Sequence, residues 1–155
     1  MIVPRYRIAA SGIAGAGRGL FLSEPVARGR VIVAPDKVHT VMTEAELRRY
    51  PPNSVEVSSS VRWFERWFSL TPEWSDECYV NHSFSPSGLW HLGFVFAAYA
   101  LPAGSEVTVD YRYVIGDGER MPFADAVTGA SIVGLPWAQA LGESAAALQR
   151  LLDGQ

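Results

Sequence analysis

Short apolar runs separated by Gly, Pro and polar turn residues dominate most of the chain. Residues 6–9, 20–22 and 31–34 are three such runs, and runs of this length between turn signals predict short β-strands. The apolar run 92–100 predicts a buried strand, and residues 106–111 alternate apolar with polar side chains, which predicts a half-buried one. The pattern therefore favours a mainly β fold with many short strands and irregular connections.

Two segments have helical signals. Thr43 and Glu46 form a capping box, which predicts a short helix over 44–50 that ends before two prolines. Residues 136–152 place leucines on one side of a helical repeat in a region rich in Ala and Leu, which predicts a C-terminal helix. The sequence thus indicates an α+β chain with one substantial helix at its end.

Two segments stay ambiguous. The polar segment 53–60 fits a loop or an edge strand. In 61–70, four aromatic residues follow a helical spacing, yet the residue types favour β structure, so helix and strand both remain open.

Composition narrows the class of protein. With 155 residues, 48% of them apolar and 19% charged, the chain is long enough for a single domain with its own core. No apolar run approaches about 18 residues, and no secretory signal is visible, so neither a membrane nor export is expected. The single Cys78 excludes an internal disulfide, and a cytoplasmic location is the expectation.

The net charge of the chain indicates no strong electrostatic attraction to a charged partner. The net charge of −3 and the pI of about 5.6 predict no general affinity for nucleic acid. Lys37 is the only lysine, and the heavy use of Arg, Ala and Gly fits a bacterial chain.

A glycine-rich loop is the first candidate binding element. Four glycines lie between Gly12 and Gly19, but Arg18-Gly19-Leu20 replaces the Gly-Lys-Ser/Thr of a P-loop. The residues that follow predict a strand, a turn and a strand, whereas a Rossmann loop opens a helix. A tight loop without a ligand remains open for this segment taken alone.

Metal and triad chemistry have weak support. His39, His82 and His91 are the only histidines, and their spacing matches no ligand pattern, so no metal site is expected. A triad of Ser83, His82 and Asp110 lacks the elbow that presents a catalytic serine.

Three stretches taken in order are more specific than any one of them. They are Gly17-Arg18-Gly19-Leu20-Phe21, then Val80-Asn81-His82-Ser83-Phe84-Ser85-Pro86 about 60 residues later, and then Gly104-Ser105-Glu106-Val107-Thr108-Val109-Asp110-Tyr111. Over residues 5–113 the chain resembles the SET-domain family, which comprises S-adenosylmethionine-dependent lysine methyltransferases. The resemblance implies a SET-type fold of several small sheets with a knot-like substructure, followed by a helical extension over 114–155 that packs on the same domain.

The resemblance also implies roles for individual residues. Gly17, Arg18, Gly19, Tyr79, Asn81 and His82 would bind S-adenosylmethionine, with Asn81 holding its amino group. Tyr111 would be the catalytic tyrosine. Trp90 and Val109 would line the substrate channel together with Tyr111, and Asp110 would fix the knot-like segment through hydrogen bonds. The substrate would be a lysine-containing protein, with neither nucleic acid nor membrane as a partner.

Departures from the family pattern leave a second function open. Ser87 stands where the family prefers Asn, Ser105 stands where it often has Glu, and a Cys-rich zinc-binding tail is absent. Without zinc, the C-terminal helix, Phe123 or Trp137 would have to cover the cofactor. The alternative to an enzyme is a SET-fold module that binds a partner but has lost catalysis.

Overall fold

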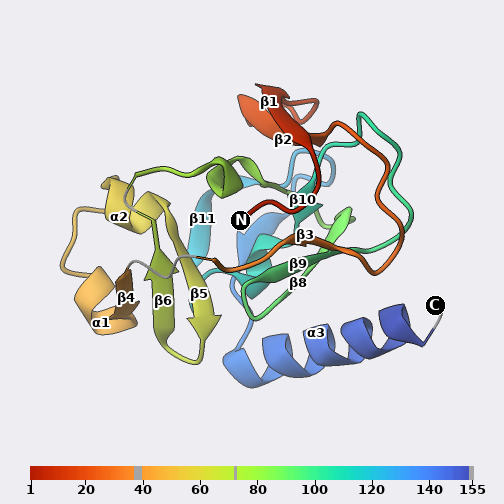
Figure 1. Cartoon of the computed structure of the whole chain (residues 1–155). Helices are drawn as coiled ribbons and strands as arrows, with labels where there is room; N and C mark the ends of the chain where they lie inside the picture. Colours follow the sequence, from red (N-terminus) through yellow and green to blue (C-terminus); the bar gives the residue numbers. More distant parts are fainter. Residues whose placement is uncertain (37–39, 72, 154–155) are drawn as a thin grey trace.

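Small β-sheets and one long helix build the fold (Figure 1). The computed structural model describes residues 1–36, 40–71 and 73–153. In chain order the strands are β1 (Tyr6–Ala10), β2 (Arg18–Leu22), β3 (Val31–Val33), β4 (Thr40–Thr43), β5 (Ser60–Phe64), β6 (Trp67–Leu70), β7 (Asn81–His82), β8 (Gly88–His91), β9 (Phe94–Ala97), β10 (Thr108–Val109), β11 (Arg120–Ala124) and β12 (Ser131–Val133). The α-helices are α1 (Glu44–Leu47), α2 (Val55–Ser58) and α3 (Trp137–Leu152), and two 3₁₀ turns are η1 (Asp76–Tyr79) and η2 (Tyr111–Tyr113).

Short sheets suit this sequence because each apolar run spans only a few residues. β3, β9 and β8 form one sheet in that order, and β1 pairs with β2. Their buried residues form the main core together with residues from the loops, which are Leu20, Leu22, Val26, Ile32, Val33, Val80, Val95, Ala97, Leu101, Val107 and Val109. The predicted mainly β fold is confirmed.

The predicted buried strand over 92–100 is shorter in the structure. β8 and β9 join through a two-residue turn at Leu92-Gly93, where both residues have positive φ, 50° and 89°. Two successive residues of positive φ are what a tight hairpin turn requires. Strand β9 therefore begins only at Phe94.

The aromatic segment 61–70 is a β-hairpin. β5 and β6 pair antiparallel, β4 adds to the other side of β6, and Glu65 takes a positive φ of 46° in the turn. The three strands form a lobe with α1 and α2 at the left of Figure 1. The strand interpretation of 61–70 is thus correct.

Two other local predictions need correction. Segment 53–60 contains the helix α2, because the Ser54 side chain accepts the N–H of Val57 and caps its first turn. Residues 106–111 do not form one half-buried strand. Glu106 bridges to β2, Thr108 and Val109 form β10, and Tyr111 begins η2.

Helix α3 follows the predicted C-terminal segment and packs against β8. It buries Ala140, Ser144 and Leu151. The Oγ of Ser144 lies 2.9 Å from Nδ1 of His91, which fixes the helix on the sheet by a polar contact as well as by apolar packing.

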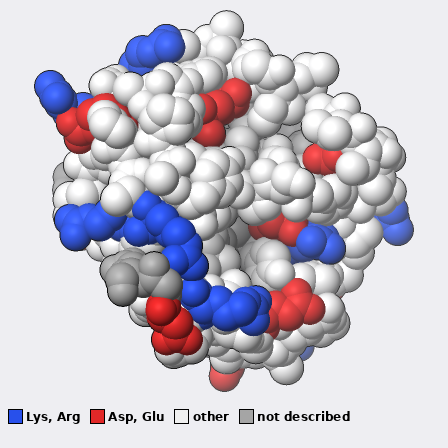
Figure 2. All heavy atoms as spheres, turned by 90° about the vertical axis from the view of Figure 1, so that its right-hand side faces the viewer, with Lys and Arg blue, Asp and Glu red and all other residues white. Residues whose placement is uncertain are grey.

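The face that carries the end of α3 presents Arg and acidic side chains in separate small groups among uncharged residues (Figure 2). Arg28 donates to the carbonyl of Arg150 at 2.8 Å, and a cation is favourable at the C-terminal end of a helix. In the part of the chain that the structure describes, no helix has the length and apolar character of a membrane span.

Candidate functional site

The Asn81-His82 segment and the Asp110-Tyr111 segment meet in space. β7 and β10 pair in parallel, with Asn81 opposite Thr108 and His82 opposite Val109. The pairing continues beyond β7, where Ser83 donates its N–H to the carbonyl of Val109 at 3.1 Å. Two stretches separated by about 25 residues in sequence thus form one wall.

That wall borders a cavity of about 1210 Å³. Among its lining residues are seven of the cofactor-binding, channel and catalytic residues expected from the resemblance, namely Arg18, Tyr79, Asn81, His82, Trp90, Val109 and Tyr111. Gly17, Gly19 and Asp110 do not line it. The structure therefore gathers most of the predicted site residues around a single space, which is larger than the roughly 300–1,000 Å³ of common ligand pockets.

Position 19 has no room for a side chain, because the carboxylate of Glu106 lies against its backbone. A Cβ at this position would lie 2.2 Å from Oε1 of Glu106 and 3.1 Å from Nδ2 of Asn81. Gly17 lies earlier in the loop with a φ of +74°, in the left-handed region that favours glycine. The glycines thus shape the loop, and its residues 13–16 and Arg18 line the cavity.

A carboxylate holds the glycine loop to Asn81. Oε1 of Glu106 accepts from Ser11 Oγ at 2.6 Å and from Asn81 Nδ2 at 3.0 Å, and Oε2 accepts the Gly12 N–H at 2.9 Å. Asn81 Nδ2 also donates to the carbonyl of Arg18 at 2.9 Å. These bonds fix the Asn81 amide with its nitrogen toward the loop.

Tyr79 and Arg18 form a second contact across the site. The guanidinium carbon of Arg18 lies 5.3 Å from the centroid of the Tyr79 ring. Such stacking is weak but directional. It places an aromatic ring and a cation together at the cavity wall.

Tyr111 is held by both its backbone and its hydroxyl. The O–H donates to the carbonyl of Val80 at 2.8 Å, and the N–H donates to Nδ1 of His82 at 3.1 Å. Burial raises the pKa of Tyr111 to about 12, and the neighbouring thiol of Cys78 acts in the same direction. At neutral pH the side chain is therefore a neutral phenol with a fixed orientation.

Trp90 and Val109 form an apolar part of the cavity wall, together with Tyr111. Val109 is a buried member of the main core, and Trp90 packs against that core. Trp90 and Tyr111 also pack against a second cluster, formed by Val114, Ile115 and Ile132. The two rings thus join two cores at the cavity.

Asp110 makes its side-chain hydrogen bonds to Arg112, within its own turn. Its carboxylate accepts the Arg112 N–H at 3.0 Å and pairs with the Arg112 guanidinium, with Nη2 to Oδ2 at 2.5 Å. The guanidinium in turn lies 4.8 Å from the centroid of the Phe84 ring. Asp110 therefore caps η2, and its ion pair with Arg112 places a guanidinium beside Phe84 of the 81–86 segment.

Ser87, a departure from the family pattern, has a clear structural role. Its Oγ donates to the Glu106 carbonyl at 3.0 Å and accepts the Thr108 N–H at 2.9 Å. Its own N–H donates to Thr108 Oγ1 at 3.0 Å. A serine here links the second and third motifs.

The C-terminal region contributes one of the three candidates for covering the cavity. Phe123 lines it from β11, with its ring 6.4 Å from that of Tyr111 in an edge-to-face arrangement. Trp137 and helix α3 do not line it. Trp137 instead lies 5.7 Å from the guanidinium of Arg62, and α3 packs on β8, so Phe123 is the alternative that the geometry favours.

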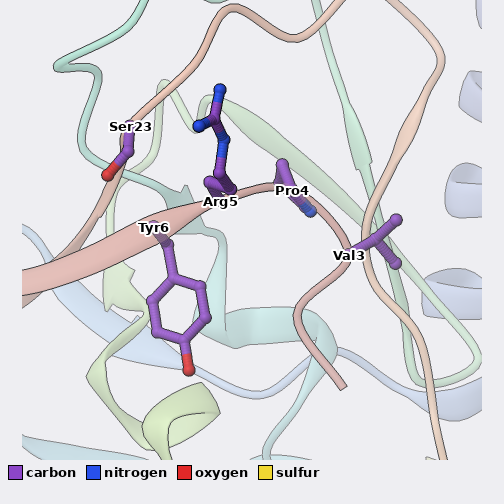
Figure 3. A pocket seen from close by; sticks show the side chains of 5 residues that line it. All are labelled: Val3, Pro4, Arg5, Tyr6 and Ser23. Atoms are coloured by element: carbon purple, nitrogen blue, oxygen red, sulfur yellow. The ribbon is translucent and has the colours of Figure 1, made fainter.

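A second, more open depression lies near the N-terminus (Figure 3). Two of its polar side chains already have partners, because Arg5 pairs with Glu24 at 2.8 Å and the Tyr6 hydroxyl donates to Asp76 at 2.7 Å. Within the described residues, no group of three or more His, Cys, Asp or Glu side chains is placed to hold a metal ion. His39 lies outside the described residues.

Sequence reasoning assigned no role to Glu106 or Asp125. Glu106 lies inside the quoted third motif, so its position was visible, but its bonds to the glycine loop were not. Asp125 is 4% exposed and lies 3.6 Å from His82, in a region without a recognisable motif. Only the tertiary structure brings Asp125 to the site.

Known proteins add evidence on the fold. No family model matches the chain, and no curated protein matches its sequence. One similar solved structure is described as the crystal structure of an active polycomb repressive complex 2 in the stimulated state. The match has a TM-score of 0.61 and 16% sequence identity, and it covers 88% of this chain but only 18% of the other. The chain thus has a SET-like α+β fold and spans less than a fifth of that protein's length.

Proposed function

We propose that this protein transfers a methyl group from S-adenosylmethionine to the side-chain amine of a lysine in a protein substrate. The observation that carries the proposal is the single cavity bordered by Arg18, Tyr79, Asn81, Trp90 and Tyr111. The SET-like fold of the chain supports it.

The residues present fit the proposed cofactor. The cavity volume of about 1210 Å³ accommodates a nucleoside and a lysine side chain together. Because Asn81 Nδ2 is turned toward Arg18 and Glu106, its Oδ1 is the atom left to accept from an ammonium group. The Tyr79 ring offers a flat face next to it. S-adenosylmethionine, when bound, supplies an electrophilic methyl group on a sulfonium sulfur.

The chain's own contribution begins with the substrate amine. A free lysine with a pKa of about 10.4 is only about 0.1% neutral near pH 7.4, which costs about 4 kcal/mol. The apolar walls from Trp90 and Val109 disfavour the ammonium form, so the amine releases its proton more readily on entering. Because these apolar side chains exclude water, the neutral lysine nitrogen beside them has no hydrogen bonds to solvent.

Tyr111 acts by position. Because its pKa is raised to about 12, Tyr111 is protonated at neutral pH, and very little phenolate is present to act as a base. Its hydroxyl is held at Val80 and its backbone at His82, so the ring and the oxygen have fixed places beside the cavity. Alignment of the reacting groups is the main source of rate enhancement expected from such a site.

The proposal has a direct test. Purified protein, freed of carried-over cofactor, is titrated calorimetrically with S-adenosylmethionine and then assayed for transfer of a labelled methyl group to lysine-rich protein. One-to-one binding with transfer supports the enzyme. Binding without transfer favours the alternative, a SET-fold binding module, and the absence of any binding contradicts the cofactor assignment.

Tyr111→Phe separates binding from catalysis. It removes the hydroxyl that donates to Val80, so transfer is expected to fall on the order of 10²-fold while cofactor affinity changes little. Tyr113→Phe is the matched control, because Tyr113 bonds to Glu143 at 2.8 Å and does not line the cavity. Equal activity of both variants would refute the role of Tyr111.

A further inference from the structure

His82 lies between Tyr111 and a carboxylate outside the recognised motifs. Its Nδ1 accepts the backbone N–H of Tyr111 at 3.1 Å, and its Nε2 lies 3.6 Å from Oδ1 of Asp125. Both side chains are almost excluded from solvent, with 4% and 3% of their surface exposed. Asp125 lies between β11 and β12, beyond the part of the chain that resembles the SET family.

The contact to Tyr111 is compatible with one tautomer of a neutral His82. A neutral imidazole has one N–H and one acceptor nitrogen, and Nδ1 is the acceptor here. The proton is therefore on Nε2, on the side that faces Asp125. Nε2 is buried and has no partner within normal hydrogen-bond distance among the described residues. Burial lowers the pKa of His82, which favours this neutral form.

Asp125 is oriented by its second oxygen. Oδ2 accepts the N–H of Val127 at 3.2 Å, the N–H of Thr128 at 2.7 Å and the hydroxyl of Thr128 at 2.8 Å. These bonds lower the pKa of Asp125, so the group is a carboxylate at neutral pH. Because Oδ2 is occupied in the turn, Oδ1 is directed at His82.

The other charges around His82 compensate one another. Asp110 raises the pKa of His82 and Arg112 lowers it, and these two residues form an ion pair with each other. Among the ion pairs of the described residues, Asp125 pairs with no arginine, and its Oδ1 is the oxygen that faces the His82 ring.

We propose that Asp125 is a positioning residue for Tyr111 and acts through His82. Its carboxylate selects the tautomer of His82 with the proton on Nε2. That tautomer keeps Nδ1 free to hold the Tyr111 N–H at the start of η2. The turn between β11 and β12 is thereby coupled to the site. The role of Tyr111 rests on the proposed function, whereas the pairing of Asp125 with His82 does not.

Asp125→Asn tests the pairing with minimal change in shape. The amide oxygen must take the place of Oδ2, because two backbone N–H groups point there. The amide nitrogen then faces His82 Nε2 as a donor, so Nε2 has to accept and the proton moves to Nδ1. Nδ1–H and the Tyr111 N–H are then two donors that face each other, and their contact is lost.

The tautomer is read from the ¹⁵N shifts of the imidazole in histidine-labelled protein, with His39→Asn and His91→Asn variants for assignment. In the wild type the proton is expected on Nε2, and in Asp125→Asn on Nδ1. The Tyr111 amide is expected to exchange faster with solvent in the variant. Methyl transfer is expected to fall about tenfold or more, with little change in cofactor affinity.

Thr128→Val is the matched control. It weakens the same turn by removing the hydroxyl bond to Oδ2, but it leaves Oδ1 facing His82. The wild-type tautomer is expected to persist in this variant, with faster exchange at Thr128 and not at Tyr111. A shift of the tautomer in both variants would mean that the turn alone determines it, which would overturn the proposal.

The remaining outcomes are also decisive. A wild-type proton on Nδ1 overturns the pairing without any variant, even if Asp125→Asn fails to fold. A switched tautomer with undiminished methyl transfer overturns the role in positioning Tyr111. If the wild type shows no methyl transfer at all, the proposed function fails, while the tautomer and the Tyr111 amide still test the link from Asp125 to His82.

Discussion

Gly19 and Glu106 are in such close approach that no side chain larger than hydrogen fits between them. A Cβ on Gly19 would lie 2.2 Å from Oε1 of Glu106. That oxygen accepts from both Ser11 and Asn81, so it has little freedom to move aside. The glycine in the first motif and the carboxylate in the third are therefore parts of one structural unit.

Gly19→Ala is expected to displace Glu106 and release the Asn81 amide. Overpacking of this kind costs about 1–3 kcal/mol in stability, and cofactor affinity should fall with it. Gly142→Ala is the control, because a Cβ at Gly142 has no atom within 4 Å and alanine favours a helix. Chemical unfolding and calorimetry measure both effects. Unchanged affinity in Gly19→Ala would show that the glycine–carboxylate unit does not support the site.

Phe123 offers a test of how the cavity is covered without zinc. Its side chain is 49% exposed and meets the Tyr111 ring edge to face at 6.4 Å. Phe123→Ala should lower the free energy of unfolding by about 1 kcal/mol, because about half of the residue is buried. Because Phe123 also lines the cavity, loss of its ring should weaken ligand binding by about 0.5–1.5 kcal/mol, the value of one aromatic contact.

The control for Phe123 is Val127→Ala. Val127 is 87% exposed in the neighbouring turn and does not line the cavity. Its truncation should leave the affinity for S-adenosylmethionine and for the protein substrate unchanged. If Phe123→Ala behaves in the same way as Val127→Ala, the ring covers neither ligand.

Arg62 ties the hairpin lobe to the C-terminal region. Its side chain is 1% exposed, pairs with Asp117 and donates to the carbonyl of Leu135 at 3.0 Å. Its backbone N–H donates to the carbonyl of Val114 at 2.6 Å. Burial lowers the pKa of Arg62, while Asp117 opposes that shift.

Asp117→Ala should destabilise the protein by about 1–3 kcal/mol, because it leaves a buried cation with one partner fewer. The Asp117 carboxylate is itself 57% exposed, which keeps the effect below that of a fully buried pair. In the double variant Arg62→Met, Asp117→Ala the cation is absent, so part of the loss should be recovered. Urea unfolding of the four proteins gives the coupling energy, and strict additivity would contradict the interpretation.

Local pattern was enough to predict the β-rich class and helix α3, because both depend on the spacing of apolar residues along the chain. The turns at Glu65 and Leu92 were not predictable in this way. Each is a non-glycine residue with positive φ, held there by strand pairing on both sides. The helix α2 depends on the Ser54 cap, a signal easily missed within a polar segment.

The site shows the same division. The order of the three motifs predicts Asn81, Tyr111 and the glycine loop as parts of one site, and these lie together in space. β11 and β12 had no such signal, because their residues 120–124 and 131–133 carry neither a regular alternation nor a turn motif. The contributions of Phe123 and Asp125 depend on the packing of this hairpin against the motif residues. Such long-range contacts follow from the whole fold and not from any local segment.

His91 gives the fold a pH dependence near neutrality. Burial under α3 lowers the pKa of His91 from its ordinary value of 6.5. In the unfolded chain the imidazole therefore gains its proton at a higher pH than in the folded protein. Stability is lost as the pH falls from about the ordinary histidine pKa toward the lower folded value.

Thermal unfolding from pH 8 to pH 5 is expected to show a constant midpoint at the alkaline end and a falling midpoint below about pH 6.5. His91→Asn keeps a polar atom near Ser144 Oγ but removes the titrating ring, so the slope should decrease. A smaller slope should remain, because burial also lowers the pKa of His82. Carboxylates with lowered pKa values, such as Asp125, lose their contribution only at more acidic pH. An identical slope in His91→Asn and the wild type would place the pH dependence elsewhere in the chain.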